Sequence, residues 1–137
     1  MNIRVILDTN IFISGIFWKG NYCSQIIDAW KSEKITLVSS LEIIQELVQT
    51  LQDFKIEMPK AMIEEWRRMI IKNAMIVLPI ENLHLIKEDP DDNKFFEAAI
   101  TGKANYIISQ DKHVLKIKAY RGIKTASPEE FVKLLNS

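Results

Sequence analysis

A chain of 137 residues, 47% of them hydrophobic, is long enough to form one domain around a single buried core. Its 18 Lys and Arg residues equal its 18 Asp and Glu residues, so the net charge of zero gives no general affinity for nucleic acid or for a membrane surface. The single cysteine, Cys23, excludes an internal disulfide and a cysteine-based zinc site. Because no segment could span a bilayer and no signal peptide is evident, we expect one cytoplasmic domain over residues 1–137.

The first predicted element is a strand over residues 3–7. Its sequence, Ile-Arg-Val-Ile-Leu, is almost continuously apolar and β-branched, which is typical of a strand buried on both faces of a parallel sheet. Asp8 follows directly, and a turn up to Gly15 and a loop over residues 16–20 are expected. An aspartate that ends a buried strand has little structural purpose, and open α/β sheets bind their ligands at this end of the strands. Asp8 is therefore the first candidate functional residue.

Helices and strands then alternate along the chain. Apolar residues at a spacing of three and four predict helices over residues 21–31, 41–51, 60–73, 94–102 and 112–118, and from Ser127 onward. Strands are predicted over residues 35–38, 75–78, 105–109 and 122–125, whereas residues 79–89 are ambiguous, with some helical character at 83–86. This alternation predicts the α/β class, as a three-layer α/β/α sandwich around a central, mainly parallel sheet of four to five strands.

Two of these helices have recognisable start signals. Ser39 with Glu42, and Ser127 with Glu130, match the capping box, in which each side chain accepts a hydrogen bond from a backbone N–H of the first turn. Pro128 suits the first helical position because that position needs no N–H donor. Glu42 therefore already has a structural role.

Carboxylates are the strongest candidates for chemistry. The sequence has no Gly-rich phosphate loop, no nucleophile elbow and no pair of histidines at ligand spacing. Asp8 and Asp111 each follow a strand of the predicted sheet, and Asp91 or Asp92 begins a helix, so these acids are expected at the same edge. Glu46 lies one turn into the helix after the second strand.

Each acid also has a structural explanation. Asp91 or Asp92 could serve only as a helix N-cap, Asp111 could cap the next short helix, and Glu46, opposite the apolar face of its helix, could simply be solvated. Four converging carboxylates, however, would repel one another and raise their pKa values unless a cation neutralised them. Ligation by oxygen alone favours Mg²⁺ or Mn²⁺, and such an ion promotes phosphodiester hydrolysis.

Four segments in this order resemble the motifs of PIN-domain proteins, and more narrowly of the VapC-related toxins of toxin–antitoxin systems. They are Ile6-Leu7-Asp8-Thr9-Asn10-Ile11-Phe12 with Gly15; Ser40, six residues before Glu46; Asp89-Pro90-Asp91-Asp92-Asn93-Lys94-Phe95-Phe96; and Ile107-Ile108-Ser109-Gln110-Asp111. The resemblance covers essentially the whole chain. It implies a metal-dependent endoribonuclease whose Mg²⁺ or Mn²⁺ is held by the catalytic residues Asp8, Glu46, Asp92 and Asp111. Asn10 and Ser109 would orient these acids, and Ser40 and Asp91 are further supporting residues. Which of Asp91 and Asp92 faces the metal stays open.

The same resemblance implies partners. Several basic residues follow Asp111, and they could contact RNA phosphates, although a simply solvated basic face is at least as good an explanation. They are Lys112, Lys116, Lys118 and Arg121. An antitoxin protein would cover the acidic groove, with an arginine or another cation inserted among the carboxylates. We also expect a homodimer through exposed apolar positions of the Pro59 to Asn73 helix. The alternative to an enzyme is a non-catalytic binding or scaffold domain that kept the PIN fold.

Overall fold

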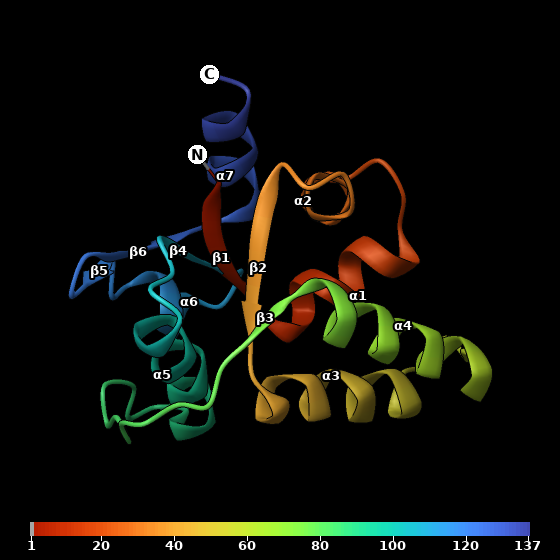
Figure 1. The fold of residues 1–137 in the computed structure, drawn as a ribbon, viewed down its shortest axis with the longest axis horizontal. Coiled ribbons are helices and arrows are strands. Elements are labelled where there is room, and N and C mark those ends of the chain that lie inside the picture. Colours follow the sequence, from red (N-terminus) through yellow and green to blue (C-terminus); the bar gives the residue numbers. More distant parts are fainter. Residues whose placement is uncertain (1) are drawn as a thin grey trace.

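Strand β1 lies in the middle of a six-stranded sheet in the structure, a computed structural model that describes residues 2–137 (Figure 1). The strands are β1 (Ile3–Leu7), β2 (Ile35–Ser39), β3 (Met75–Ile76), β4 (Tyr106–Ile108), β5 (Ala119–Tyr120) and β6 (Ile123–Ala126). The helices are α1 (Thr9–Phe17), α2 (Tyr22–Lys31), α3 (Leu41–Asp53), α4 (Lys60–Asn73), the 3₁₀ helix η1 (Pro90–Asp92), α5 (Asn93–Thr101), α6 (Lys112–Leu115) and α7 (Pro128–Leu135). No helix among these residues is long and apolar enough to cross a membrane.

The sheet has the strand order β3-β2-β1-β4-β6-β5. All neighbouring strands run parallel except β5 and β6, which form an antiparallel hairpin. The predicted α/β class with a mainly parallel sheet is therefore confirmed, and the sheet is slightly larger than expected because β5 was not predicted. The two hairpin residues Arg121 and Gly122 both have positive φ, of 50° and 82°, as a tight turn between twisted antiparallel strands requires.

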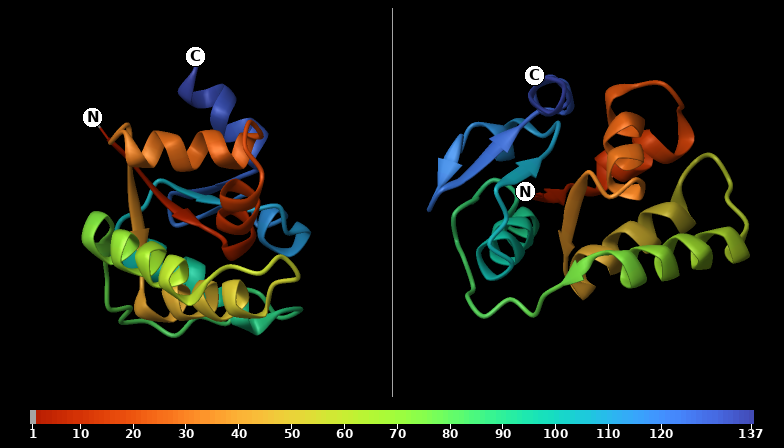
Figure 2. Two further views of the ribbon diagram at one scale, coloured as in Figure 1. Left: turned by 90° about the vertical axis from the view of Figure 1, so that its right-hand side faces the viewer. Right: turned by 45° about the horizontal axis from the view of Figure 1, so that its top comes forward.

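Two apolar cores, one on each face of the sheet, hold the layers together. Successive side chains of a strand point to opposite faces, so Val5 and Leu7 enter one core and Ile6 enters the other. The first core includes side chains from α1, α2, α3, α4 and α7, and the second is built mainly on α5. Figures 1 and 2 show α1 and α2 on one side of the central strands and α5 on the other. This arrangement is the expected three-layer sandwich.

The segment after Asp8 differs from the expectation. Residues 9–17, expected as a turn and the start of a loop, form helix α1. Ile11, Phe12 and Ile13 are buried in this helix. The sequence did not predict the helix because it is rich in Ile and begins with Thr, and both residue types have low intrinsic helix propensity. Gly15 allows close packing, since a Cβ there would lie 2.5 Å from Cδ1 of Ile27 on α2.

Smaller differences concern helix starts and one connection. Ser40, and not Ser39, caps α3 by accepting a hydrogen bond from the Ile43 N–H at 3.3 Å, because Ser39 is still part of β2. The capping box of Ser127 with Glu130 is confirmed. Residues 83–86, for which some helical character was expected, contain no regular element and lie in the long connection between β3 and η1.

The contact at Gly15 can be tested by adding one methyl group. Gly15→Ala would place its Cβ 2.5 Å from the Ile27 side chain and 2.9 Å from the Cys23 carbonyl oxygen. We expect the free energy of unfolding, measured by urea denaturation, to fall by about 1–3 kcal/mol, as is typical of overpacking. Gln25→Ala, on the exposed face of α2, is the matched control. Equal stability of Gly15→Ala and wild type would show that α1 and α2 do not pack this closely.

Candidate active site

The parallel pairing of β1 with β4 brings the first two candidate acids to one edge of the sheet. Leu7 pairs with Ile108, and the backbone N–H of Asp8 donates to the carbonyl of Ile108 at 3.1 Å. Asp111 follows β4 after two further residues. Both carboxylates therefore lie at the carboxyl edge of the sheet, where ligands of α/β proteins bind.

Ser109 connects these two acids. Its hydroxyl donates a hydrogen bond to Oδ2 of Asp8 at 2.7 Å and accepts one from the backbone N–H of Asp111 at 3.0 Å. Ser109 is completely buried, so this arrangement is shielded from water. The backbone of Asn10 also lies near the Asp8 carboxyl group and lowers its pKa.

The Asp8 carboxyl group is buried and lies among other acids. Burial raises its pKa above the usual value, the hydrogen bonds from Ser109 and Asn10 lower it, and the negative charges of Glu46 and Asp111 raise it further. The net pKa is raised. A positive charge bound near Asp8 would therefore lower this pKa and favour the ionised carboxylate.

A second group of acids adjoins Asp8. Asp89, Asp92 and Asp111 each present an oxygen such that all three oxygens lie within 4.8 Å of one another. Oδ2 of Asp92 is buried and has no hydrogen-bond partner among residues 2–137. Burial raises the pKa of Asp92 to about 7, and the charges of Asp89, Asp8 and Asp111 contribute to this increase. An unpaired buried carboxylate oxygen is costly, and a cation bound between these acids would satisfy it.

The structure separates the roles of neighbouring acids in the Asp89-Pro90-Asp91-Asp92 segment. Asp92 is buried in the acidic cluster and makes no N-cap hydrogen bond through its side chain. Asp91 is largely exposed and pairs instead with Lys94, whose hydrogen bond lowers the pKa of Asp91. Asp89 was not among the candidate residues from the sequence. Its position three residues before Asp92 could have indicated that the two acids lie close together.

Asp111 caps helix α6, as its position in the sequence suggested, and it also belongs to the acidic cluster. Its Oδ1 accepts a hydrogen bond from the backbone N–H of His113 at 2.8 Å, which caps α6. This bond fixes the carboxylate at the start of the helix. Capping and participation in an acidic site are therefore compatible.

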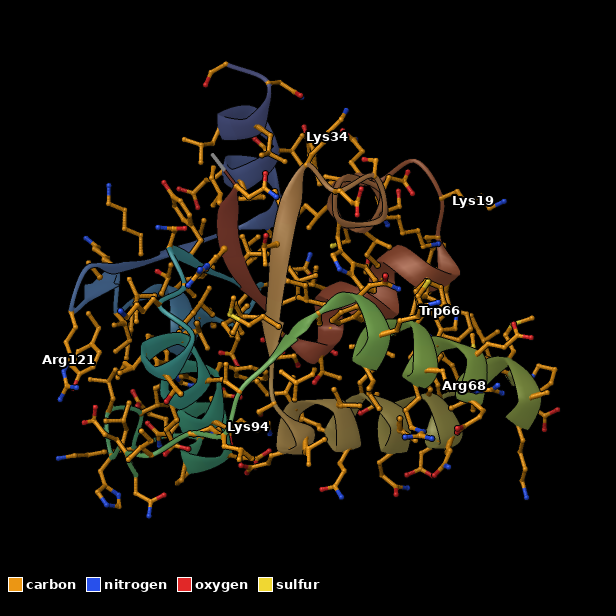
Figure 3. All side chains as sticks on the ribbon, in the orientation of Figure 1. Lys19, Lys34, Trp66, Arg68, Lys94 and Arg121 are labelled. Carbon is orange, nitrogen blue, oxygen red and sulfur yellow. The ribbon has the colours of Figure 1, made fainter. Side chains whose placement is uncertain are left out.

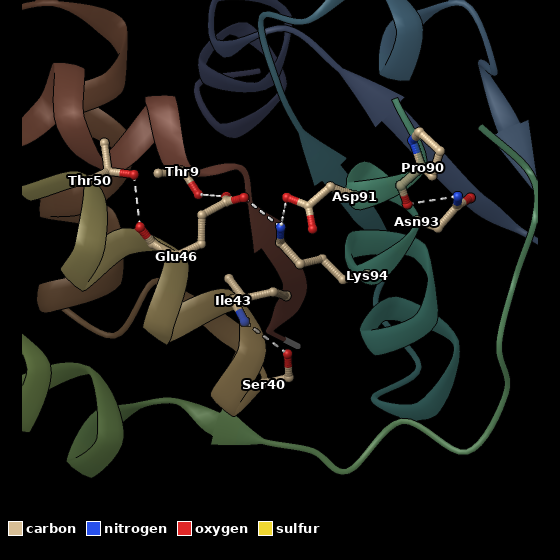
Figure 4. Close-up of polar contacts among 9 residues, drawn as sticks. All are labelled: Thr9, Ser40, Ile43, Glu46, Thr50, Pro90, Asp91, Asn93 and Lys94. Carbon is tan, nitrogen blue, oxygen red and sulfur yellow. Dashed lines mark hydrogen bonds and ion pairs between the residues drawn. The ribbon is translucent and has the colours of Figure 1, made fainter. Parts of the chain in front are cut away.

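Glu46 reaches the same region from α3, where it contacts a lysine. Lys94, from the first turn of α5, forms ion pairs with Glu46 and, at 2.6 Å, with Asp91, and the hydroxyl of Thr9 donates to the second oxygen of Glu46 (Figure 4). Burial by itself would lower the pKa of Lys94, but its hydrogen bonds with Asp91 and Glu46 outweigh burial and raise that pKa. Ser40 supports this arrangement by capping the helix that carries Glu46.

The four basic residues proposed for RNA contact are all exposed: Lys112, Lys116, Lys118 and Arg121. Two of them pair with acids of the connection between β3 and η1, Lys116 with Glu88 and Arg121 with Glu81. Figure 3 labels Arg121 at the β5–β6 hairpin, well separated from Lys94. Of the four, Lys112 is closest in sequence to a candidate acid, because it directly follows Asp111.

The raised pKa of Asp92 predicts how stability depends on pH without metal. The folded protein holds a proton on Asp92 up to a pKa of about 7, whereas the ordinary value is 3.8. In the presence of a chelator, the free energy of unfolding should thus fall as the pH rises from 3.8 to about 7. Urea denaturation across this range should show a smaller fall in Asp92→Asn.

Asp91→Asn is the matched control, because the pKa of Asp91 is lowered. The stabilisation linked to Asp91 is present above its ordinary pKa and is lost only as the pH falls through the lowered value. Asp91→Asn should therefore keep the decrease between acid and neutral pH. The same decrease in Asp92→Asn as in wild type would contradict the assignment to Asp92.

Comparisons with known proteins agree with this geometry. A family model described as PIN domain matches residues 4–113. An uncharacterized protein of Methanocaldococcus jannaschii is 30% identical, in an alignment that covers 97% of this chain and 92% of that protein. The fold is similar to that in the crystal structure of VapBC2 from Rickettsia felis bound to a DNA fragment from their promoter, with 14% identity, a TM-score of 0.59 and coverage of 91% of this chain and 98% of that one. Since the family model covers most of its length, the chain belongs to the PIN-domain family.

Proposed function

We propose that this protein is a metal-dependent endoribonuclease that hydrolyses phosphodiester bonds of RNA and is the toxin of a toxin–antitoxin pair. PIN domains are generally nucleases, and the fold similarity to VapBC2 supports the toxin assignment. The observation that carries the proposal is the unpaired, buried carboxylate oxygen of Asp92, next to Asp89, Asp111 and Asp8. Such an atom is expected at a cation site and is costly elsewhere.

The donor atoms fit Mg²⁺ or Mn²⁺. Asp89, Asp92 and Asp111 offer only carboxylate oxygens, which hard divalent cations prefer over the softer ligands that zinc and copper take. A bound ion would stabilise the negative charge that develops on the phosphoryl group and would lower the pKa of an attacking water. Asp92 and Asp111, with Asp89, would hold the ion, while Ser109 keeps the Asp8 carboxylate fixed near them.

The remaining groups would bind the substrate and partners. Lys112, Lys116, Lys118 and Arg121 would contact RNA phosphates on the side of Asp111. An antitoxin would place its own positive charges against the acidic edge. Met62 and Ile71, both exposed on α4, would contribute to a homodimer contact.

The first test is cleavage of RNA by the purified protein. We expect cleavage with Mg²⁺ or Mn²⁺ and none with a chelator. Asp8→Asn and Asp92→Asn should each reduce the rate by about 100-fold or more, the range for groups that act at the reacting atoms. Asp28→Asn, an exposed aspartate on α2, is the matched control and should cleave like wild type. Undiminished cleavage by Asp8→Asn would rule out the mechanism.

The second test separates an enzyme from the non-catalytic binding or scaffold domain. Binding of an ion to the folded state alone should raise the free energy of unfolding by about 2.7 kcal/mol at a concentration of 100 times the Kd. We expect Mn²⁺ to raise the melting temperature of wild type and of Asp28→Asn, but much less that of Asp92→Asn. Wild type that melts at the same temperature with and without Mn²⁺ would favour the scaffold alternative.

A further inference from the structure

Lys94 is the unusual residue of this site, because its side chain is only 3% exposed. A buried ammonium is costly unless it is paired and hydrogen-bonded. Its partners come from two elements, Glu46 on α3 and Asp91 on η1, which directly precedes α5. Figure 4 shows the ammonium between these two carboxylates, with the chain of Lys94 extending from α5 toward α3.

Both oxygens of Glu46 already have partners within the chain. Oε1 pairs with Lys94, and Oε2 accepts the hydroxyl hydrogen of Thr9. Asp92 shows the opposite situation, since its buried Oδ2 has no partner among residues 2–137. The two halves of the acidic site therefore differ: a lysine of the chain neutralises one half, whereas no basic side chain among residues 2–137 pairs with Asp92 in the other.

We propose that the Lys94 ammonium takes the place of a second metal ion, so that the site binds one divalent cation, at Asp89, Asp92 and Asp111. This inference rests on the proposed metal-dependent function and deepens it. Glu46 then acts as a positioning residue: it pairs with the ammonium of Lys94 and does not bind the ion itself. The positive charge that a second ion would supply is part of the chain.

An ion could reach the Glu46 half of the site if Lys94 were absent. A groove of about 640 Å³ between α3, α4 and α5 is lined by Glu46, Asp91 and Lys94, among other residues. Removing the ammonium would leave two carboxylates at this groove without a cation. Two carboxylates that both contact one ammonium lie close enough together to bind a divalent cation in its place.

The test is the number of Mn²⁺ ions bound per chain, measured by isothermal titration calorimetry and by electron paramagnetic resonance of the bound ion. Wild type should bind one ion. Lys94→Met keeps the length of the side chain but removes the charge, and it should bind two. Lys94→Arg keeps the charge and should bind one. Lys133→Met removes an exposed lysine that pairs with Glu129 on α7, and this matched control should also bind one.

A second variant tests the role of Glu46 and does not depend on the folding of Lys94→Met. Glu46→Gln should still bind one Mn²⁺, with an affinity within about threefold of wild type because Glu46 is not a ligand, whereas Asp92→Asn should weaken binding by about tenfold or more. Circular dichroism checks that each variant is folded. If Lys94→Met does not fold, the comparison of Glu46→Gln with Asp92→Asn decides alone.

The outcomes distinguish this inference from the proposed function. Two ions in wild type, one ion in folded Lys94→Met, or loss of binding in Glu46→Gln would each overturn the role of Lys94 and leave metal dependence intact. Wild type that binds no Mn²⁺ would overturn the proposed metal site itself, and the inference with it.

Discussion

The parallel pairing of β1 with β4 is the constraint on which the rest of the site depends. It places the ends of two buried strands side by side, and each strand is followed by residues that end in a carboxylate. The hydroxyl of Ser109 then joins the two acids through Oδ2 of Asp8 and the backbone N–H of Asp111. Because both apolar cores pack against β1, the position of Asp8 is fixed by much of the hydrophobic interior.

Burial and repulsion act in the same direction at this edge. Both favour protonated carboxyl groups, which explains the raised pKa values of Asp8 and Asp92. The chain offsets this cost in only one half of the site, where Lys94 pairs with Glu46 and Asp91. In the other half, the buried Oδ2 of Asp92 has no partner among residues 2–137.

Much of this structure could be predicted from the sequence, for physical reasons. The apolar run of residues 3–7 and the alternation of strands and helices determine the sandwich, and Asp8 is conspicuous because it directly follows a buried strand. Helix α1 was missed because its β-branched residues resemble a strand locally, while tertiary packing against α2 and α3 determines the helix. Lys94 and Asp89 were missed because both look like solvated charges at a helix start, and the burial of Lys94 depends on Glu46, 48 residues away in the sequence.

A charge that is covalently attached behaves differently from one that must be bound. The ammonium of Lys94 is present at Glu46 and Asp91 at a fixed effective concentration that no chelator, dilution or shortage of metal can change. The alignment of α3 with α5 therefore needs no bound ion. In thermodynamic terms, part of the organisation of the site is transferred from binding to folding.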